Sequence, residues 1–515
     1  MASPDMSSAP FTPDDPSAIA AWDGDRSLSY EQWDDRAARL AEGLAGLGLG
    51  NGDRVAVRMH TRLEWLVTSL AIAKIGGTLV GLNYRFTPRE VLPILRDSGT
   101  VALILDDDDP APLVQAIGPL ALRAVVHLSD RPVLPVSFDA LIDKNPAAVR
   151  AASDLAPMIL YSSGTTGAPK GVLLSDRRDA GFGPAQLAEY AHSVAFEGAV
   201  GGPGTVSLVS LPLHHGIGPA YTRSALASGG QVVLQRKFDP VELPSLVERH
   251  RITHWTCVPT MLTRALAQPV ELLRQHDLSS LRFIQVGGAP VGNALKERAA
   301  TTLQADVYES YGAIETGMIA GASLDENRAK PGTVGRPFRH VDIRIVDEAG
   351  DAVPPGTSGE VLIRTPMIVR GYLGQEPLGP DKVDAQGYYR SGDVGHLDED
   401  GYLFLSDRIS DLIIAGGANI NPLEIEEVLS THPAVSLAAV VGVPDADRGE
   451  QPVAFVELRP GASATEAELI GSLDGVLAKY KWPRRVHFVD TMPTNSSGKL
   501  LKRDLRTLLE GSPAT

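Results

Sequence analysis

Tyr161-Ser162-Ser163-Gly164-Thr165-Thr166-Gly167-Ala168-Pro169-Lys170-Gly171-Val172 is the stretch on which the fold and the chemistry of this chain depend. It lies between the apolar segments 158–160 and 172–174, which are typical of buried strands. Its glycines allow the backbone to turn tightly and to bring N–H groups close to an anion. Its hydroxyl groups and its lysine add further donors. The combination predicts a cradle for a polyphosphate.

Two other interpretations of this stretch are disfavoured. A Walker A loop is excluded because Gly164 and Lys170 do not have its spacing, a proline precedes the lysine, and no helical pattern follows. A flexible Ser/Gly surface loop would not require so many special residues to coincide between two strands. We therefore retain the phosphate cradle.

Length and charge limit the class of protein. A chain of 515 residues and 54.6 kDa is too long for one core and suits two or three fused units. Hydrophobic residues make up 43% and charged residues 21%, as in globular proteins. Lys and Arg number 47 against 63 Asp and Glu, for a net charge of −16. This negative field argues against general binding of nucleic acid or of an anionic membrane.

The sequence also predicts a cytoplasmic protein without a stable membrane span. Residues 1–16 lack the apolar core of a signal peptide, and the apolar stretch 66–82 is interrupted by Lys74 and two glycines. The single cysteine, Cys257, lies in an apolar, strand-like segment and is expected to be a small buried hydrophobic residue.

Helical and strand patterns alternate along the first part of the chain, which predicts α/β layers around a largely parallel sheet. The predicted elements are helices over 31–47, 65–75 and 89–97, strands over 53–57, 78–82 and 102–105, and a second α/β stretch over 158–285. The acidic run 106–109 is expected to be a solvated loop.

The pattern of apolar residues changes after residue 341. Ile343, Ile345, Val361 and Ile363 alternate along the chain around the turn 351–359, which predicts a small antiparallel unit. Segments of mixed strand and helix pattern follow, and the last hundred or so residues are expected to form a compact domain.

Seven motifs in order resemble the adenylate-forming superfamily of acyl-CoA synthetases, peptide-synthetase adenylation domains and beetle luciferases. Besides the cradle they are Leu211-Pro212-Leu213-His214-His215, Gly287-Gly288-Ala289-Pro290, Tyr311-Gly312-Ala313-Ile314-Glu315, Tyr389-Arg390-Ser391-Gly392-Asp393, Asp407-Arg408 leading into Gly416-Gly417-Ala418-Asn419-Ile420-Asn421-Pro422, and Gly498-Lys499. The resemblance covers most of the chain.

The resemblance implies a site for ATP. The cradle residues would hold the β- and γ-phosphates, Tyr311 would stack on adenine beside the loop backbone, and Asp393 would accept hydrogen bonds from both ribose hydroxyls. Arg408 would contact the ribose or a phosphate. The implied nucleotide-binding residues are Ser162, Ser163, Gly164, Thr165, Thr166, Gly167, Lys170, Gly288, Ala289, Tyr311, Gly312, Asp393 and Arg408.

The resemblance also implies the catalytic groups. Glu315 would supply an oxygen ligand to Mg²⁺, with Thr166 as a second candidate ligand and catalytic residue. Lys499 would insert between the carboxylate and the α-phosphate and neutralise both as the bond forms.

The distant position of Lys499 implies domain motion. In such enzymes a small C-terminal domain first closes with its lysine inward and then rotates, so that Gly416, Gly417 and Ala418 line a tunnel for CoA. The expected fold is α/β, with a large N-terminal domain of layered sheets plus a small antiparallel β unit, and a small mobile α+β domain. The expected segments are a flexible tail (1–17), the AMP-binding domain (18–405), a hinge (406–411) around Ser410, and a lid domain (412–515).

Two positions depart from the family pattern, and the substrate is weakly specified. Ile314 stands where relatives usually carry threonine, and Ser410 stands where Asp or Lys is common.

The segment 216–220 offers no acid to hold an α-ammonium group, which disfavours amino acids as substrates. The expected pocket residues are small or neutral and suit an aliphatic or aromatic acid: His215, Gly216, Gly287 and Ala313. For His215 a structural role stays open.

The predicted activity is that of an ATP-dependent carboxylate–CoA ligase, with acyl-AMP as intermediate. Its substrates would be a small carboxylic acid, ATP and CoA, with Mg²⁺ as cofactor and no nucleic acid as partner. One alternative is an adenylating enzyme with another acceptor: a carrier protein, an amine, or nitrite activation for N–N bond formation. The other is a nucleotide-binding protein without catalysis.

Overall fold

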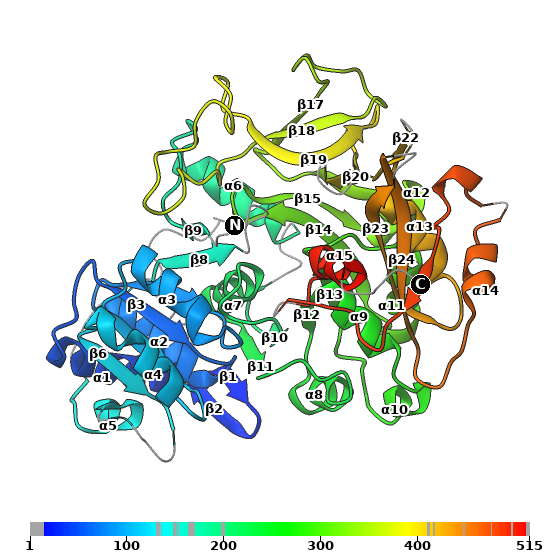
Figure 1. Ribbon diagram of the computed structural model, residues 1–515. Helices are drawn as coiled ribbons and strands as arrows, with labels where there is room; N and C mark the ends of the chain where they lie inside the picture. The colour runs from blue at the N-terminus through cyan, green and yellow to red at the C-terminus, as the bar shows by residue number, and fades with distance from the viewer. Residues whose placement is uncertain are drawn as a thin grey trace.

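A computed structural model gives the fold of the chain (Figure 1). It describes residues 15–129, 134, 136–147, 152, 154–162, 170–196, 201–408, 413–415, 418–445, 449–474, 476–495 and 498–510. The helices are α1 (Tyr30–Gly46), α2 (Leu63–Lys74), α3 (Pro88–Asp97), α4 (Ala111–Ile117), α5 (Phe138–Asp143), α6 (Pro184–Val194), α7 (Ile217–Ala227), α8 (Leu243–His250), α9 (Pro259–Leu266), α10 (Val270–Arg274), α11 (Asn293–Leu303), α12 (Leu324–Ala329), α13 (Pro422–Ser430), α14 (Glu466–Gly471) and α15 (Lys502–Glu510).

The largest sheet among the described residues passes from parallel to antiparallel pairing. Neighbouring strands from β1 through β11, β10, β12 and β13 to β14 are parallel, and those from β14 to β17 are antiparallel. Its order is β17 (Asp342–Val346), β18 (Gly359–Arg364), β19 (Tyr389–Leu397), β20 (Leu403–Arg408), β16 (Thr333–Pro337), β15 (Gly317–Ser323), β14 (Asp306–Ala313), β13 (Phe283–Gly287), β12 (His254–Cys257), β10 (Val206–Val209), β11 (Gln231–Leu234), β1 (Ile19–Asp23) and β2 (Arg26–Ser29).

A second sheet is formed by the N-terminal α/β repeat and ends at the cradle. Its order is β7 (Val136–Ser137), β6 (Ala124–His127), β5 (Ala102–Leu105), β3 (Arg54–Arg58), β4 (Thr78–Leu82), β8 (Met158–Ser162) and β9 (Lys170–Leu173). Only the pair of β8 and β9 is antiparallel in this sheet as described. The two strands predicted around the cradle are therefore confirmed as a hairpin.

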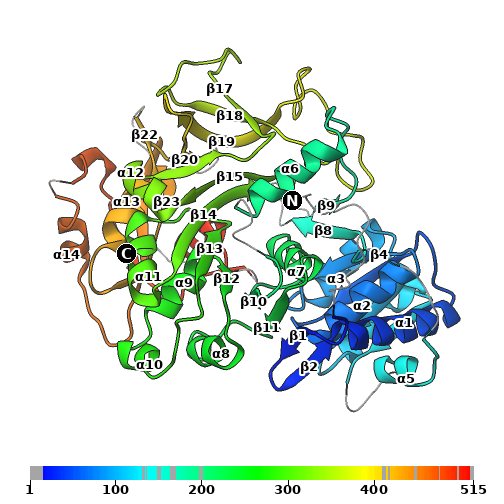
Figure 2. The ribbon, with the colours of Figure 1, turned by 180° about the vertical axis from the view of Figure 1, so that it is seen from behind.

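The third sheet belongs to the C-terminal part of the chain. It contains β22 (Ala418–Ile420), β21 (Ile413–Ala415), β24 (Gly449–Leu458), β23 (Val435–Asp445) and β25 (Val486–Phe488). Figures 1 and 2 show this part, drawn in orange and red, packed against the side of the molecule that carries α9, α11 and α12. The predicted fold class is confirmed.

The predicted antiparallel unit is present as the pair of β17 and β18. Ile343 pairs with Ile363 and Ile345 with Val361, and all four side chains are buried. The unit is not separate, because β20 pairs with β16 and so continues the large sheet. Cys257 is buried in the apolar cluster under β12, as predicted. None of the described helices is both long and apolar enough to cross a membrane.

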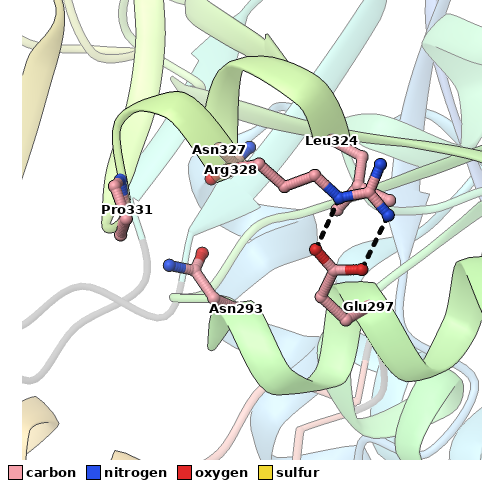
Figure 3. Close-up of a pocket in the computed structure, with 6 residues that line it drawn as sticks. All are labelled: Asn293, Glu297, Leu324, Asn327, Arg328 and Pro331. Atoms are coloured by element: carbon pink, nitrogen blue, oxygen red, sulfur yellow. Dashed lines mark hydrogen bonds and ion pairs between the residues drawn. The ribbon is translucent and has the colours of Figure 1, made fainter.

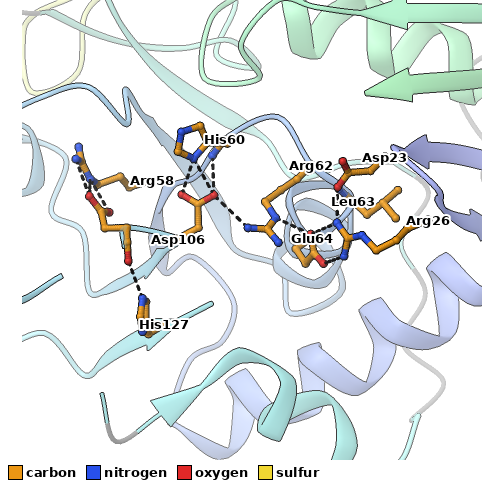
Figure 4. A network of polar contacts seen from close by, with 10 residues as sticks. Asp23, Arg26, Arg58, His60, Arg62, Leu63, Glu64, Asp106 and His127 are labelled. Atoms are coloured by element: carbon orange, nitrogen blue, oxygen red, sulfur yellow. Dashed lines mark hydrogen bonds and ion pairs between the residues drawn. The ribbon is translucent and has the colours of Figure 1, made fainter. Parts of the chain in front are cut away.

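The prediction of a solvated loop for 106–109 is wrong for its first residue. Asp106 is 5% exposed, and its carboxylate accepts hydrogen bonds from the His60 backbone and ring and from Arg62 (Figure 4). Asp107 accepts two hydrogen bonds from Arg58. A carboxylate can be buried when donors compensate for the loss of water, and these donors come from a loop about 45 residues earlier in the chain.

Candidate active site

The two residues expected at adenine and ribose lie in contact. The Tyr311 hydroxyl donates a hydrogen bond to the Asp393 carboxylate, which joins β14 to β19. Asp393 is 8% exposed, and its backbone N–H donates to Ser391 Oγ at 3.0 Å. The contact fixes the orientation of a carboxylate that has little access to water and keeps acceptor capacity for hydroxyl groups.

Tyr372 lies between Lys170, at the far end of the cradle, and Glu315, the residue expected to bind metal. The Tyr372 hydroxyl donates to Glu315 Oε1 at 3.1 Å, and Lys170 Nζ lies 4.8 Å from the centroid of the Tyr372 ring. Burial raises the pKa of Tyr372 to about 12, and the charge of Glu315 adds to the effect. Tyr372 therefore stays a neutral donor that connects Lys170 with Glu315.

Glu315 fits a hard cation in one respect. Its half-buried carboxylate receives one hydrogen bond from Tyr372 and retains further lone pairs, and oxygen is the ligand that Mg²⁺ prefers. Within the described part of the chain no cluster of three or more His, Cys, Asp or Glu could hold a metal alone.

The ends of the cradle are fixed by the β8–β9 hairpin, in which Ser162 pairs with Lys170. The predicted phosphate-binding residues Ser163, Gly164, Thr165, Thr166 and Gly167 lie outside the described residues.

The segment 287–290, which is expected to lie beside adenine and is called the adenine loop below, begins with two glycines that sit in close packing. Gly288 has φ +81°, and a Cβ there would lie 3.3 Å from Ile217 Cδ1 and 3.6 Å from Val258 Cγ1. A Cβ on Gly287 would lie 2.5 Å from the Ser310 carbonyl oxygen. The loop therefore sits close to α7 and to the end of β12, with Ala289 directly after Gly288.

The lysine loop from the C-terminal part of the chain docks on the same place. Gly498 has φ +81°, and a Cβ there would lie 3.0 Å from Val258 Cγ2 and 2.9 Å from Thr260 Oγ1. The Thr260 hydroxyl donates to the Gly498 carbonyl oxygen at 2.6 Å. Val258 thus packs beside both Gly288 and Gly498, which brings the backbone of Lys499 next to the adenine loop.

Two family models match this chain. The one described as AMP-binding enzyme covers residues 7–373, and the one described as AMP-binding enzyme C-terminal domain covers residues 424–499. The chain belongs to the AMP-binding enzyme family.

Relatives of this AMP-binding enzyme have different named acceptors. It is 35% identical over 501 residues to the fatty acid–[acyl-carrier-protein] ligase ScoC of Streptomyces coeruleorubidus, covering 95% of this chain and 93% of the relative. It is also 35% identical over 496 residues to a feruloyl-CoA synthase of Amycolatopsis sp, covering 95% and 96%.

Among solved structures, ATP-bound MatB from Rhodopseudomonas palustris superposes with a TM-score of 0.83 at 30% identity over 97% of both chains. Apo MatB from the same organism superposes with a TM-score of 0.72 over the same shares. The described arrangement is therefore more similar to the ATP-bound structure than to the apo structure.

The histidine motif of this AMP-binding enzyme is buried at the start of α7. Burial lowers the pKa of His215 to about 4 and lowers the pKa of His214 well below its usual value, so both are neutral near pH 7. A Cβ on Gly216 would lie 3.5 Å from Leu160 Cδ1 and 3.7 Å from Ile314 Cγ1. Ile314 packs on the apolar cluster that contains Val172 and Ile368.

The remaining predicted residues are only partly described. Gly312 lies in β14, where a Cβ would meet the Gly317 carbonyl oxygen at 2.6 Å, and Ala313 ends this strand. The Arg408 backbone pairs with Asp393, and Ala418 begins β22. Ser410, Gly416 and Gly417 lie outside the described residues.

A separate pocket of about 270 Å³ opens between α11 and α12 (Figure 3). Asn293, Leu324, Asn327 and Pro331 line it with the ion pair of Arg328 and Glu297, in which Arg328 Nε lies 2.7 Å from Glu297 Oε1. None of the predicted site residues lines this pocket.

The sequence did not indicate three residues that assemble the site: Val258, Thr260 and Tyr372. A signal exists for two of them, because Pro259 favours the first turn of a helix and so places α9 directly after β12. Nothing in the sequence indicates that Tyr372 would connect Lys170 with Glu315.

Proposed function

We propose that this enzyme joins a carboxylic acid to CoA in two steps, with ATP as the energy source and acyl-AMP as the intermediate. The observation that carries the proposal is the docking of the Lys499 loop on Thr260 and Val258, beside the adenine loop. A lysine that the C-terminal part of the chain brings to this place can neutralise an anion that binds there.

In the first step a carboxylate oxygen attacks the α-phosphorus of ATP, and the bond to the pyrophosphate oxygen breaks. Lys499 neutralises the two approaching anions, and the cradle with Thr165, Thr166 and Lys170 holds the β- and γ-phosphates. Asp393, held by Tyr311, accepts the ribose hydroxyls. Mg²⁺, bound by Glu315 with Thr166 as a further candidate ligand, would neutralise phosphate charge when present.

The acid would lie between the start of α7 and the ends of β13 and β14, beside His215, Gly216, Gly287 and Ala313. His215 is neutral near pH 7 because burial lowers its pKa to about 4. Small and neutral walls favour an aliphatic or aromatic acid over an amino acid.

In the second step the CoA sulfur attacks the acyl carbonyl, the bond to AMP breaks, and the thiol proton leaves to solvent. We infer that the segment 412–515 rotates about the hinge 406–411, with Ser410 at its centre, relative to the AMP-binding domain 18–405. Gly416, Gly417 and Ala418 would then line the CoA tunnel. The closer similarity to ATP-bound than to apo MatB supports the assignment of the described arrangement to the first step. The reaction is placed in the cytoplasm, where ATP and CoA are available.

A second acceptor is kept because the relative ScoC is named a ligase to an acyl carrier protein. An amine acceptor and nitrite activation stay as further possibilities of the same first step. A nucleotide-binding protein without catalysis would retain ATP binding and lack the first step.

The deciding experiment is ATP–pyrophosphate exchange across aliphatic and aromatic acids, amino acids and nitrite, followed by AMP release with and without CoA or a carrier protein. We expect exchange with at least one aliphatic or aromatic acid and AMP release that depends on CoA. ATP binding without exchange on any compound would contradict the proposal, and release indifferent to CoA would exclude CoA as acceptor.

Lys499→Ala tests the two-step assignment. Loss of a preorganised cation should lower exchange by about 10²–10³-fold or more while sparing thioester formation from supplied acyl-AMP. Lys479→Ala, at an exposed lysine of the same segment, is the matched control. Equal loss of both steps in Lys499→Ala would contradict the assignment.

A further inference from the structure

Three polar side chains meet in the interior beneath Gly287. Tyr221 comes from α7, Gln285 from β13 and Ser310 from β14. Gln285 Nε2 donates to Ser310 Oγ at 3.0 Å, and these two residues are 1% and 8% exposed. Tyr221 Oη and Gln285 Oε1 are buried as well, and neither has a hydrogen-bond partner of acceptable geometry among the residues that the structure describes.

This cluster lies directly behind the proposed acid site. Gln285 and Gly287 project from the same face of β13, because alternate residues of a strand share a face. A Cβ on Gly287 would lie 2.8 Å from Ser310 Oγ. Tyr221 follows Ile217 by one turn of α7, and Ile217 packs against the position of Gly288. The polar groups therefore lie one layer deeper than Gly287, on the side that faces α7.

The hydrogen-bonding capacity of the cluster exceeds what it can satisfy alone. Two hydroxyls and one amide carry four donor hydrogens, and a closed ring of three bonds leaves one amide hydrogen over, whichever way the Gln285 amide is oriented. Burial raises the pKa of the Tyr221 hydroxyl, and the side chains of Gln285 and Ser310 lower this pKa by a smaller amount. The hydroxyl therefore stays protonated and can donate a hydrogen bond. A buried polar group without a hydrogen bond destabilises the fold, so a further group that completes these hydrogen bonds would account for the cluster.

We propose that Tyr221, Gln285 and Ser310 form the inner, polar end of the acid pocket and that the substrate acid carries a hydroxyl group there. A hydroxyl can accept from Tyr221 or from the Gln285 amide nitrogen and can donate to Gln285 Oε1. The three side chains are neutral, so a second carboxylate would be buried against them without a counter-charge. The inference rests on the proposed function, since it names the class of acid that the same site takes.

The test compares acids that differ by one hydroxyl in pyrophosphate exchange with the full-length enzyme. Suitable pairs are benzoate with 4-hydroxybenzoate, cinnamate with 4-hydroxycinnamate, and octanoate with 8-hydroxyoctanoate, with octanedioate as the charged analogue. We expect kcat/KM to favour the hydroxylated acid by about 10²-fold in at least one pair, because a site built for a hydroxyl rejects the analogue that lacks it. Octanedioate should be a poor substrate.

Tyr221→Phe and Gln285→Leu should each reduce this preference at least tenfold. A change in the ratio of two substrates cannot arise from loss of folded enzyme. Tyr308→Phe, which removes a hydroxyl from the same face of β14, is the matched control and should keep the preference.

Exchange with unsubstituted acids but preferences below about twofold in every pair would overturn the inference and leave the proposed function standing. A preference for octanedioate would also overturn it. A preference that survives in both variants would show that other residues bind the hydroxyl. Exchange with none of the acids in either panel would instead count against the proposed function.

Discussion

The Thr260 hydroxyl donates a hydrogen bond of 2.6 Å to the Gly498 carbonyl oxygen, across 238 residues of sequence. Thr260 lies in the first turn of α9, and Gly498 precedes the lysine proposed to neutralise the reacting anions. The bond therefore joins the large sheet domain to the loop that carries Lys499. It would exist only while the C-terminal part of the chain faces the adenine loop.

Thr260→Val should weaken the first step selectively. The change keeps the shape of the side chain and removes one neutral hydrogen bond, whose net contribution is about 0.5–1.5 kcal/mol. We expect pyrophosphate exchange to fall by about 3- to 10-fold, with thioester formation from supplied acyl-AMP unchanged. Thr263→Val on the same helix is the control, and an equal fall in both steps would contradict the prediction.

Gly498→Ala should be more severe than Thr260→Val. The new methyl would meet Thr260 Oγ1 at 2.9 Å and Val258 Cγ2 at 3.0 Å, and φ at this residue is +81°. Gly461→Ala separates strain from contact, because Gly461 has φ +76° with nothing within 4 Å of its Cβ position. We expect exchange to fall at least tenfold in Gly498→Ala only. Similar losses in both variants would attribute the effect to backbone strain alone.

The hydroxyl of Tyr311 should position Asp393 for ATP. Tyr311→Phe retains the ring and removes the hydrogen bond to the carboxylate, so we expect KM for ATP to rise several-fold with kcat nearly unchanged. Asp393→Asn should raise KM more, and the double variant should be no worse than Asp393→Asn, because the tyrosine would act through the carboxylate. Additive losses would show that Tyr311 contributes independently of Asp393.

Elements with a regular pattern were predictable from the sequence. The alternation of Ile343, Ile345, Val361 and Ile363 predicted the antiparallel unit that β17 and β18 form, because residues two apart in a strand share one buried face. The strands β8 and β9 were predictable for a comparable reason, since two apolar runs flank the glycine-rich stretch, and the structure shows that they pair antiparallel.

Contacts between distant segments were not predictable in this way. Asp106 is buried because His60 and Arg62, which lie on another loop, donate hydrogen bonds to its carboxylate. One sequence alone does not show which distant residues come into contact. The docking of Gly498 on Thr260 and the cluster around Gln285 depend in the same way on tertiary packing. Local sequence patterns predict helices and strands, whereas these sites are formed by residues that tertiary packing brings together.

A buried carboxylate in the N-terminal part of the fold should make stability depend on pH. Burial alone would raise the pKa of Glu64, but Arg26 and Arg62 outweigh it and hold this pKa at about 2 (Figure 4). A carboxyl whose pKa is lower in the folded than in the unfolded state stabilises the fold above the unfolded pKa near 4.5. That contribution is lost as pH falls from 4.5 toward 2.

We therefore expect Glu64→Gln to lower the thermal unfolding midpoint at pH 7 by about 2–3 °C, which for a chain of this length corresponds to a loss on the order of 2–3 kcal/mol. The difference from the unsubstituted enzyme should shrink below pH 4 in calorimetric scans across pH 3–8. Glu399→Gln, at an exposed position, should change the midpoint little at any pH. A difference that persists unchanged at pH 3 would show that Glu64 acts by packing and not by charge.

Ile314 offers a test of how the phosphate site compensates for a missing hydroxyl. Ile314 directly precedes Glu315. Its side chain packs on the apolar cluster that contains Val172 and Ile368, and it lies near the position of Gly216. Ile314→Thr removes apolar contact, which should lower the unfolding free energy by about 1 kcal/mol. It also adds a donor where relatives carry one, and a hydrogen bond to a charged group is worth about 1.5–3 kcal/mol. We expect adenylate formation to become several-fold faster, with a lower KM for ATP.

Ile368→Thr is the control. It adds a hydroxyl to the same apolar cluster at a residue that is not next to Glu315 in the sequence, and it should only destabilise the enzyme. Unchanged or slower adenylation in Ile314→Thr, measured by pyrophosphate exchange, would show that neighbouring groups already make the contact that the hydroxyl supplies in relatives.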